Sequence, residues 1–189
     1  MTPDKISAKE RSLLFPIILS EHNPAWPEWF AEEKKNLEKL IGNAIYRIAH
    51  IGSTRVPGLL AKPTVDILIE VPIDTDIEAL KAALPYPEYI KMPDSDKADV
   101  PPLHLMFVKG YTNDGFAEKV YHIHIRYIDD WDEAHFCEYL TVHPEIANAY
   151  AALKRKLNAR FEYDRDRYTD AKSEFIKSVT KQARKTAEK

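Results

Sequence analysis

The 189-residue sequence contains a single cysteine, Cys137, and no apolar run that approaches the length of a membrane span. One cysteine cannot form an internal disulfide or a multi-thiolate metal site, which favours a reducing compartment. Residues 1–5 lack the basic and apolar regions of a secretion signal. The sequence therefore predicts a cytoplasmic protein with no membrane partner.

Glycine is also scarce, with five residues, and the two glycine-rich phosphate motifs are missing. Neither the P-loop pattern nor the dinucleotide-binding pattern occurs, so the phosphate-binding loops of these two nucleotide-binding classes are both absent. The net charge is −3 and the pI is about 6.2, which gives no global field that would hold nucleic acid. The composition thus provides no clear nucleic-acid signal.

The composition fits one compact domain over residues 1–189, because 44% of the residues are hydrophobic. Apolar alternation and β-branched runs predict strands over residues 13–19, 45–51, 65–71, 103–109 and 119–128. Capping residues and helical spacing predict helices that begin near Asn23, Thr75, Asp130, His143 and Thr169. The predicted fold is α+β, with a sheet-containing core over about 13–130 and a helical part over about 131–180.

A polar loop lies between two of the predicted strands and contains the densest chemistry of the chain. It holds two glycines, two prolines, three hydroxyl side chains and two cations between Ile51 and Val65. Gly52 permits close approach of a phosphate, Ser53 can donate to its oxygens, and Asp66 on the next strand can hold a divalent cation. Alone, this pattern also fits turn geometry with Asp66 bonded to backbone amides.

The predicted strand over residues 119–128 has a polar face. A period of two places His122, His124 and Arg126 together, opposite a row of apolar side chains. The two histidines are either part of a partly exposed sheet face or ligands of a metal or substrate. The cations Lys154, Arg155 and Lys156 are expected on a solvated helix face.

Several segments together resemble the GrpB-like family, which is placed in the polymerase β-like nucleotidyltransferase superfamily and has largely unassigned activity. The segments that carry the resemblance are His50–Thr54, Val56–Leu59, Ala61–Pro63, Asp66–Ile67, Phe136–Leu140, His143–Glu145, Tyr150–Lys154 and Tyr168–Ile176. The likeness extends from about Phe15 to Ile176. It implies a small mixed sheet flanked by helices, with a Gly-Ser turn and strand carboxylates that bind a nucleoside triphosphate and Mg²⁺.

The superfamily pattern is only partly present. Gly52 and Ser53 match its phosphate-contacting pair, and Asp66 matches its first carboxylate. Leu68 stands at the second carboxylate position, and the third would fall near His122 to Arg126, where the chain has no acid. Two-metal phosphoryl transfer needs several anionic ligands, so this loss is a large deficit.

The resemblance, taken with these residues, implies two functions from different classes. The first is a metal-dependent nucleotidyltransferase with an unknown acceptor, in which Asp66 is catalytic and the loop residues that bind the substrate are Gly52, Ser53, Thr54, Arg55 and Lys62. The second is a non-catalytic module that binds a nucleotide or another anionic ligand. In either, Asp66, His122 and His124 are the expected metal ligands, for Mg²⁺, Mn²⁺ or Zn²⁺. Glu70 lies about 13 Å along the strand from Asp66, too far to share an ion.

Overall fold

The computed structural model describes residues 6–93 and 103–187, which divide into two compact units. The sheet unit comprises Ile6 and the described residues of Ala25–His50 and Thr64–Asp130. The helical unit comprises Ser7–Pro24, Ile51–Pro63 and Trp131–Lys189. The prediction of one domain over residues 1–189 stays a prediction.

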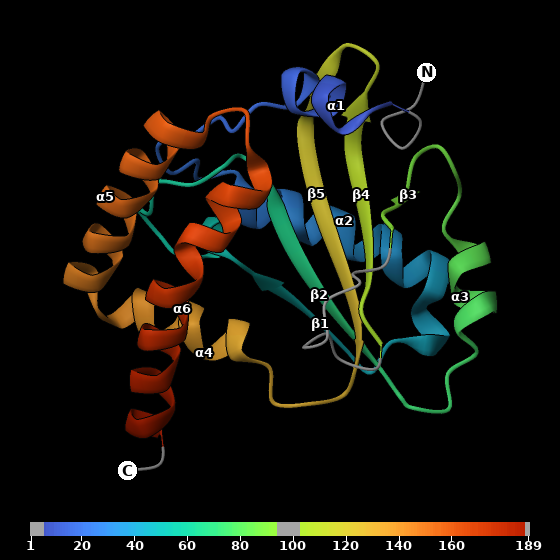
Figure 1. Ribbon diagram of the computed structural model, residues 1–189. Coiled ribbons are helices and arrows are strands. Elements are labelled where there is room, and N and C mark those ends of the chain that lie inside the picture. The colour runs from blue at the N-terminus through green and yellow to red at the C-terminus, as the bar shows by residue number, and fades with distance from the viewer. Residues whose placement is uncertain (1–5, 94–102, 188–189) are drawn as a thin grey trace. The chain divides into compact units, whose positions relative to one another are not determined.

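The sheet unit is built on five strands in the order β1-β2-β5-β4-β3 (Figure 1). Its strands are β1 Arg47–Ile51, β2 Val65–Val71, β3 Ile90–Lys91, β4 Leu105–Thr112 and β5 Gly115–Tyr127. β2 and β5 run parallel, whereas β4 pairs antiparallel with both β5 and β3. The helices are α2 Trp26–Ile41 and α3 Ile77–Ala83, and a short 3₁₀ turn, η1, spans Gly42–Ala44.

Helix α2 packs against one face of the sheet. Its buried Glu33 accepts hydrogen bonds from Lys109 of β4 and from Tyr89, and the Tyr121 hydroxyl of β5 reaches a backbone carbonyl of α2. Because side chains alternate along a strand, the residues next to Tyr121 face the other way. Asp66, His122 and His124 therefore lie on the face of the sheet opposite α2.

An irregularity in β4 changes which face its last residues occupy. Lys109 pairs with Tyr121, yet Tyr111 pairs with Phe116, and Gly110 between them has a φ of 84°. Lys109 contacts Glu33 on the α2 side, whereas the Tyr111 hydroxyl lies 2.8 Å from His122 on the opposite side. The bulge at Gly110 thus turns Tyr111 to the face that carries the two histidines.

The helical unit contains α1 Ala8–Leu14, η2 Ser53–Arg55, α4 Asp132–Val142, α5 Pro144–Phe161 and α6 Arg165–Ala187. The last three helices contact one another pairwise (Figure 1). Val56, Leu59 and Leu60, from the segment between β1 and β2, pack in the same apolar cluster as Phe136 and Leu140. The polar loop singled out in the sequence is therefore anchored in the helical unit by its apolar residues.

The structure corrects several predicted boundaries. The strand over residues 13–19 is wrong: Ser7 and Glu10 form a capping box that starts α1, and only an isolated bridge at Ser20 follows. Neither Asn23 nor Asp130 caps a helix, because α2 and α4 begin after Ala25 and Trp131 without a side-chain cap.

The last helix begins at Arg165, before the predicted Thr169. The sequence also predicts a long, charged and proline-bearing loop over residues 93–102, and all of these residues except Pro93 lie outside the described residues. Among the helices that the structure describes, none combines the length and apolar character that crossing a membrane requires.

Candidate functional site

The parallel pairing of β2 and β5 brings one carboxylate and two imidazoles together. Asp66 is the register partner of His122, and His124 follows two residues later on the same face. Asp66 Oδ1 lies 3.1 Å from His122 Nδ1 and 3.9 Å from His124 Nε2. One potential ligand atom from each residue falls within 4.8 Å of the others.

The Asp66 carboxylate is held in its ionised form. Its partial burial alone would raise its pKa, but hydrogen bonds from His122 and His124, and the charge on these rings, outweigh burial and hold the pKa well below its ordinary value. The side chain keeps 27% of its surface exposed, whereas His122 keeps 8%. Its partners in the described chain are the two histidines and no backbone amide, so the alternative of a purely loop-bracing Asp66 does not hold.

Tyr111 and His104 form a second layer around the imidazoles. His122 Nδ1 faces Asp66 while its Nε2 lies 2.8 Å from the Tyr111 hydroxyl, so both ring nitrogens are engaged. The His124 ring stacks on His104 with centroids 6.2 Å apart. His124 Nδ1 is buried and has no hydrogen-bond partner among the described residues. Such outer contacts fix ring orientation at metal sites.

The donor set fits a single divalent transition-metal ion. Ligand atoms of one ion bonded at about 2.1 Å lie about 3.0–3.4 Å apart, close to the spacing between Asp66 and His122. Two imidazoles and one carboxylate suit Zn²⁺, Mn²⁺ or Fe²⁺ better than Mg²⁺. Among the described residues, the site contains no second carboxylate: Leu68 is buried and apolar, and Glu70 is paired with Arg47 and with the Asp129 amide.

The predicted substrate-binding residues Gly52, Ser53, Thr54, Arg55 and Lys62 belong to the helical unit, whereas the three metal-ligand candidates belong to the sheet unit. Gly52 adopts a φ of 75°, which lets the chain turn sharply into η2. Its carbonyl accepts a bond from the buried Cys137 thiol, and Thr54 is itself buried. The assigned roles of these loop residues stay predictions.

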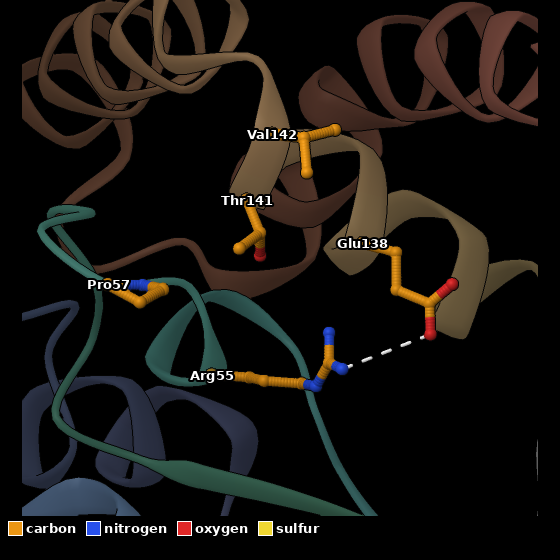
Figure 2. A pocket seen from close by; sticks show the side chains of 5 residues that line it. All are labelled: Arg55, Pro57, Glu138, Thr141 and Val142. Atoms are coloured by element: carbon orange, nitrogen blue, oxygen red, sulfur yellow. Dashed lines mark ion pairs between the residues drawn. The ribbon is translucent and has the colours of Figure 1, made fainter.

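Arg55 lines a pocket of about 310 Å³ inside the helical unit (Figure 2). Pro57, Thr141 and Val142 form other parts of its wall. Figure 2 shows the Arg55 guanidinium extending toward Glu138 of α4, and the two groups lie 3.9 Å apart. Arg55 thus has a counter-ion from its own unit. Its side chain remains 37% exposed.

Lys154 does not lie on a solvated face, contrary to the expectation from the sequence. It is 3% exposed, and its amine donates to the Ser53 hydroxyl at 3.1 Å and to the Leu60 carbonyl. Burial, and then the charges of nearby cations, lower its pKa to about 7. Helical spacing contains the signal that was overlooked, because Lys154 falls between the buried Tyr150 and Leu157 on one stripe.

The buried amine should leave a signature in the pH dependence of stability. The folded state releases the Lys154 proton near pH 7, whereas the unfolded chain holds it to about 10.5. Between these values the unfolded state binds more protons, so the free energy of unfolding should rise with pH. Relative to Lys154→Met, we expect the wild-type protein to gain about 1–2 kcal/mol between about pH 7 and 9.

Urea unfolding at several pH values measures this difference. Lys156→Met is the matched control, because Lys156 is exposed on the same helix. Its pH profile should run parallel to that of the wild type. A wild-type profile parallel to that of Lys154→Met would show that the amine keeps its proton throughout the range.

Comparisons with known proteins agree with the architecture. The family model described as GrpB protein matches residues 16–182. UPF0157 protein YqkA of Bacillus subtilis is 32% identical over 171 residues, which cover 87% of this chain and 46% of YqkA. Glutamate-rich protein GrpB of Alkalihalophilus pseudofirmus is 31% identical over 171 residues, or 86% of this chain and 93% of that protein.

The crystal structure of conserved protein GrpB from Enterococcus faecalis is also similar, with a TM-score of 0.77 and 30% identity. The match covers 91% of this chain and all of that one. It confirms the predicted α+β class, with a mixed sheet accompanied by helices. The chain spans about half the length of YqkA.

Proposed function

This chain belongs to the GrpB family, and we propose that it binds one divalent transition-metal ion through Asp66, His122 and His124. The observation that supports the proposal is the convergence of three ligand atoms within 4.8 Å on adjacent strands. An ionised carboxylate beside two imidazoles is a donor set for Zn²⁺, Mn²⁺ or Fe²⁺. Tyr111 would hold the His122 ring from outside, as outer partners of metal ligands do.

Three protein ligands leave coordination positions open for another molecule. In such sites the metal acts as a Lewis acid toward an oxygen of that molecule. The side chains of this unit would orient and hold the ion, with the Asp66 carboxylate balancing one of its two charges. A small anionic ligand, such as a nucleotide phosphate, would balance the remaining charge. We therefore favour the function of a metal-dependent binding module.

Nucleotidyl transfer is the second candidate, and the Gly52 turn followed by Ser53 favours it. Placement in the nucleotidyltransferase superfamily would make this turn the cradle of a triphosphate. Three ligands on two strands suffice to bind one metal ion, whereas the superfamily's reaction uses two metal ions. Release of pyrophosphate from a nucleoside triphosphate in the presence of Mg²⁺ or Mn²⁺, abolished by Asp66→Asn, would establish transfer in place of simple binding.

Metal binding can be tested directly on the purified chain. After treatment with a chelator, we expect equilibrium dialysis and elemental analysis to give one Zn²⁺ or Mn²⁺ per chain, with Mg²⁺ bound more weakly. Binding should raise the unfolding temperature, because a ligand that binds the folded state stabilises it. Absence of a bound ion at saturating Zn²⁺, Mn²⁺ and Fe²⁺ would refute the proposal.

A further inference from the structure

A buried ion pair lies behind the metal-ligand face, on the side of the sheet that α2 covers. Glu33 of α2 is 2% exposed and accepts hydrogen bonds from the Lys109 amine at 2.8 Å and from the Tyr89 hydroxyl at 2.7 Å. The same amine lies 2.6 Å from the Glu88 carboxylate. Loss of either partner of a buried pair leaves a charge uncompensated, so the folded chain strongly resists separation of Glu33 from Lys109.

Lys109 is the last residue of β4 in regular register with β5 before the bulge. It pairs with Tyr121, and the register shifts between Lys109 and Tyr111. Gly110 packs directly on β5, because a Cβ atom at this position would lie 2.2 Å from the Lys119 carbonyl oxygen. A single closely packed residue therefore separates the ammonium that binds α2 from the phenol that faces the histidines.

Two regular arrangements of β4 compete with this bulge, because alternation alone would place Lys109 and Tyr111 on one face. If both faced the histidines, Glu33 would lose its cation and an ammonium would lie beside the metal ligands. If both faced α2, Tyr111 would enter a region where the rings of Tyr89 and Tyr121 already lie 4.7 Å and 5.9 Å from the lysine amine. The buried cluster opposes the first arrangement by charge and the second by packing.

We propose that Glu33 and Lys109 are positioning residues of the metal site, because their buried ion pair fixes the bulge that directs the Tyr111 hydroxyl to His122. This inference rests on the proposed metal-binding function and extends it to two residues on the far side of the sheet from the ligands. The Tyr111 hydroxyl lies 2.8 Å from His122 Nε2, and outer partners of this kind contribute to metal affinity.

Zn²⁺ affinity measured by equilibrium dialysis tests the coupling. Glu33→Gln keeps the size of the side chain but removes the charge that holds Lys109, and we expect affinity to fall by about 3- to 10-fold. In a Tyr111→Phe background the same substitution should change affinity by less than about twofold, because the two residues act as a unit. Glu32→Gln is the matched control: it breaks the exposed ion pair between α2 and Lys119 of β5 and should bind Zn²⁺ as wild type.

Proton NMR of the metal-free protein measures the orientation of Tyr111 without any metal ion. The Tyr111 and His122 rings have centroids 6.0 Å apart, so we expect nuclear Overhauser effects between their ring protons in the wild type. Glu33→Gln should remove this signal, whereas Glu32→Gln should keep it. The contact between Tyr111 and Phe116, whose ring centroids are 5.2 Å apart beyond the bulge, should persist in both variants and verifies that the hairpin is folded.

Three results would overturn the proposal. The first is metal-free wild-type protein that lacks the contact between the Tyr111 and His122 rings, a measurement that needs no variant. The second is a folded Glu33→Gln protein, or a folded Lys109→Met protein, that keeps this contact and binds Zn²⁺ as wild type. The third is a double variant whose loss equals the product of the two single losses. Wild-type protein that binds no metal would instead refute the metal site itself, and the ring contacts distinguish that outcome from a failure to orient Tyr111.

Discussion

Replacing Asp66 with asparagine is expected to weaken Zn²⁺ or Mn²⁺ binding by at least about 100-fold. The substitution keeps the size of the side chain but removes the only anion that faces His122 and His124 in the described chain. An amide oxygen is a weaker ligand for these ions than a carboxylate. Equilibrium dialysis against a metal buffer measures the loss.

The outer partner should have a smaller effect than the ligands. Tyr111→Phe removes the hydroxyl that contacts His122 Nε2 and should cost about 10-fold in affinity. Asp114→Asn, in the exposed turn between β4 and β5, is the matched control and should bind as wild type. If Asp66→Asn, verified as folded, binds metal as tightly as the Asp114 variant, the assignment of Asp66 as a ligand is wrong.

Gly110→Ala should produce the largest loss of stability among the glycine substitutions considered. A Cβ atom at Gly110 would lie 2.2 Å from the backbone carbonyl oxygen of Lys119, and φ is 84°. Backbone cannot give way as a flexible side chain can, so the β4 bulge must rearrange. We expect the free energy of unfolding to fall by about 2–4 kcal/mol, measured by denaturant titration.

Gly42→Ala supplies the comparison for this substitution. Gly42 has a helical φ of −54°, and an added Cβ would meet no atom within 4 Å. Its substitution should raise the free energy of unfolding by less than about 1 kcal/mol. Equal changes in the free energy of unfolding for Gly110→Ala and Gly42→Ala would show that the Lys119 carbonyl does not constrain the bulge. A rearranged bulge should also displace Tyr111 and weaken metal binding.

The metal-ligand candidates were predictable from the sequence because they depend on the simplest periodicity. The residue range predicted for β2, Val65–Val71, is the one observed, and a period of two correctly groups His122 with His124. Parallel pairing of two long apolar strands then places Asp66 beside them. All three candidate ligands lie on these two strands. The alternation of side chains within each strand was therefore sufficient to group them.

Tyr111 and Lys154 were not predicted, for different physical reasons. Tyr111 reaches the histidines through a bulge that reverses the alternation, and the sequence around Gly110 also fits a simple turn. Lys154 is buried by contacts with Ser53 and Leu60, about a hundred residues earlier in the chain. Charge alone favours exposure for such a residue, and the only local signal against exposure is its place on the apolar stripe of α5 with Tyr150 and Leu157.

The division of the chain has a practical consequence for experiments that dissect the protein. The helical unit includes Ser7–Pro24 and Ile51–Pro63 as well as everything after Asp130, so neither unit is one continuous segment. A fragment cut at Asp130 would retain Val56, Leu59 and Leu60 without the helices on which they pack. Separate expression of either half would leave apolar surface uncovered and promote aggregation. Circular permutants or point variants of the intact chain are therefore better suited to assign its functional residues.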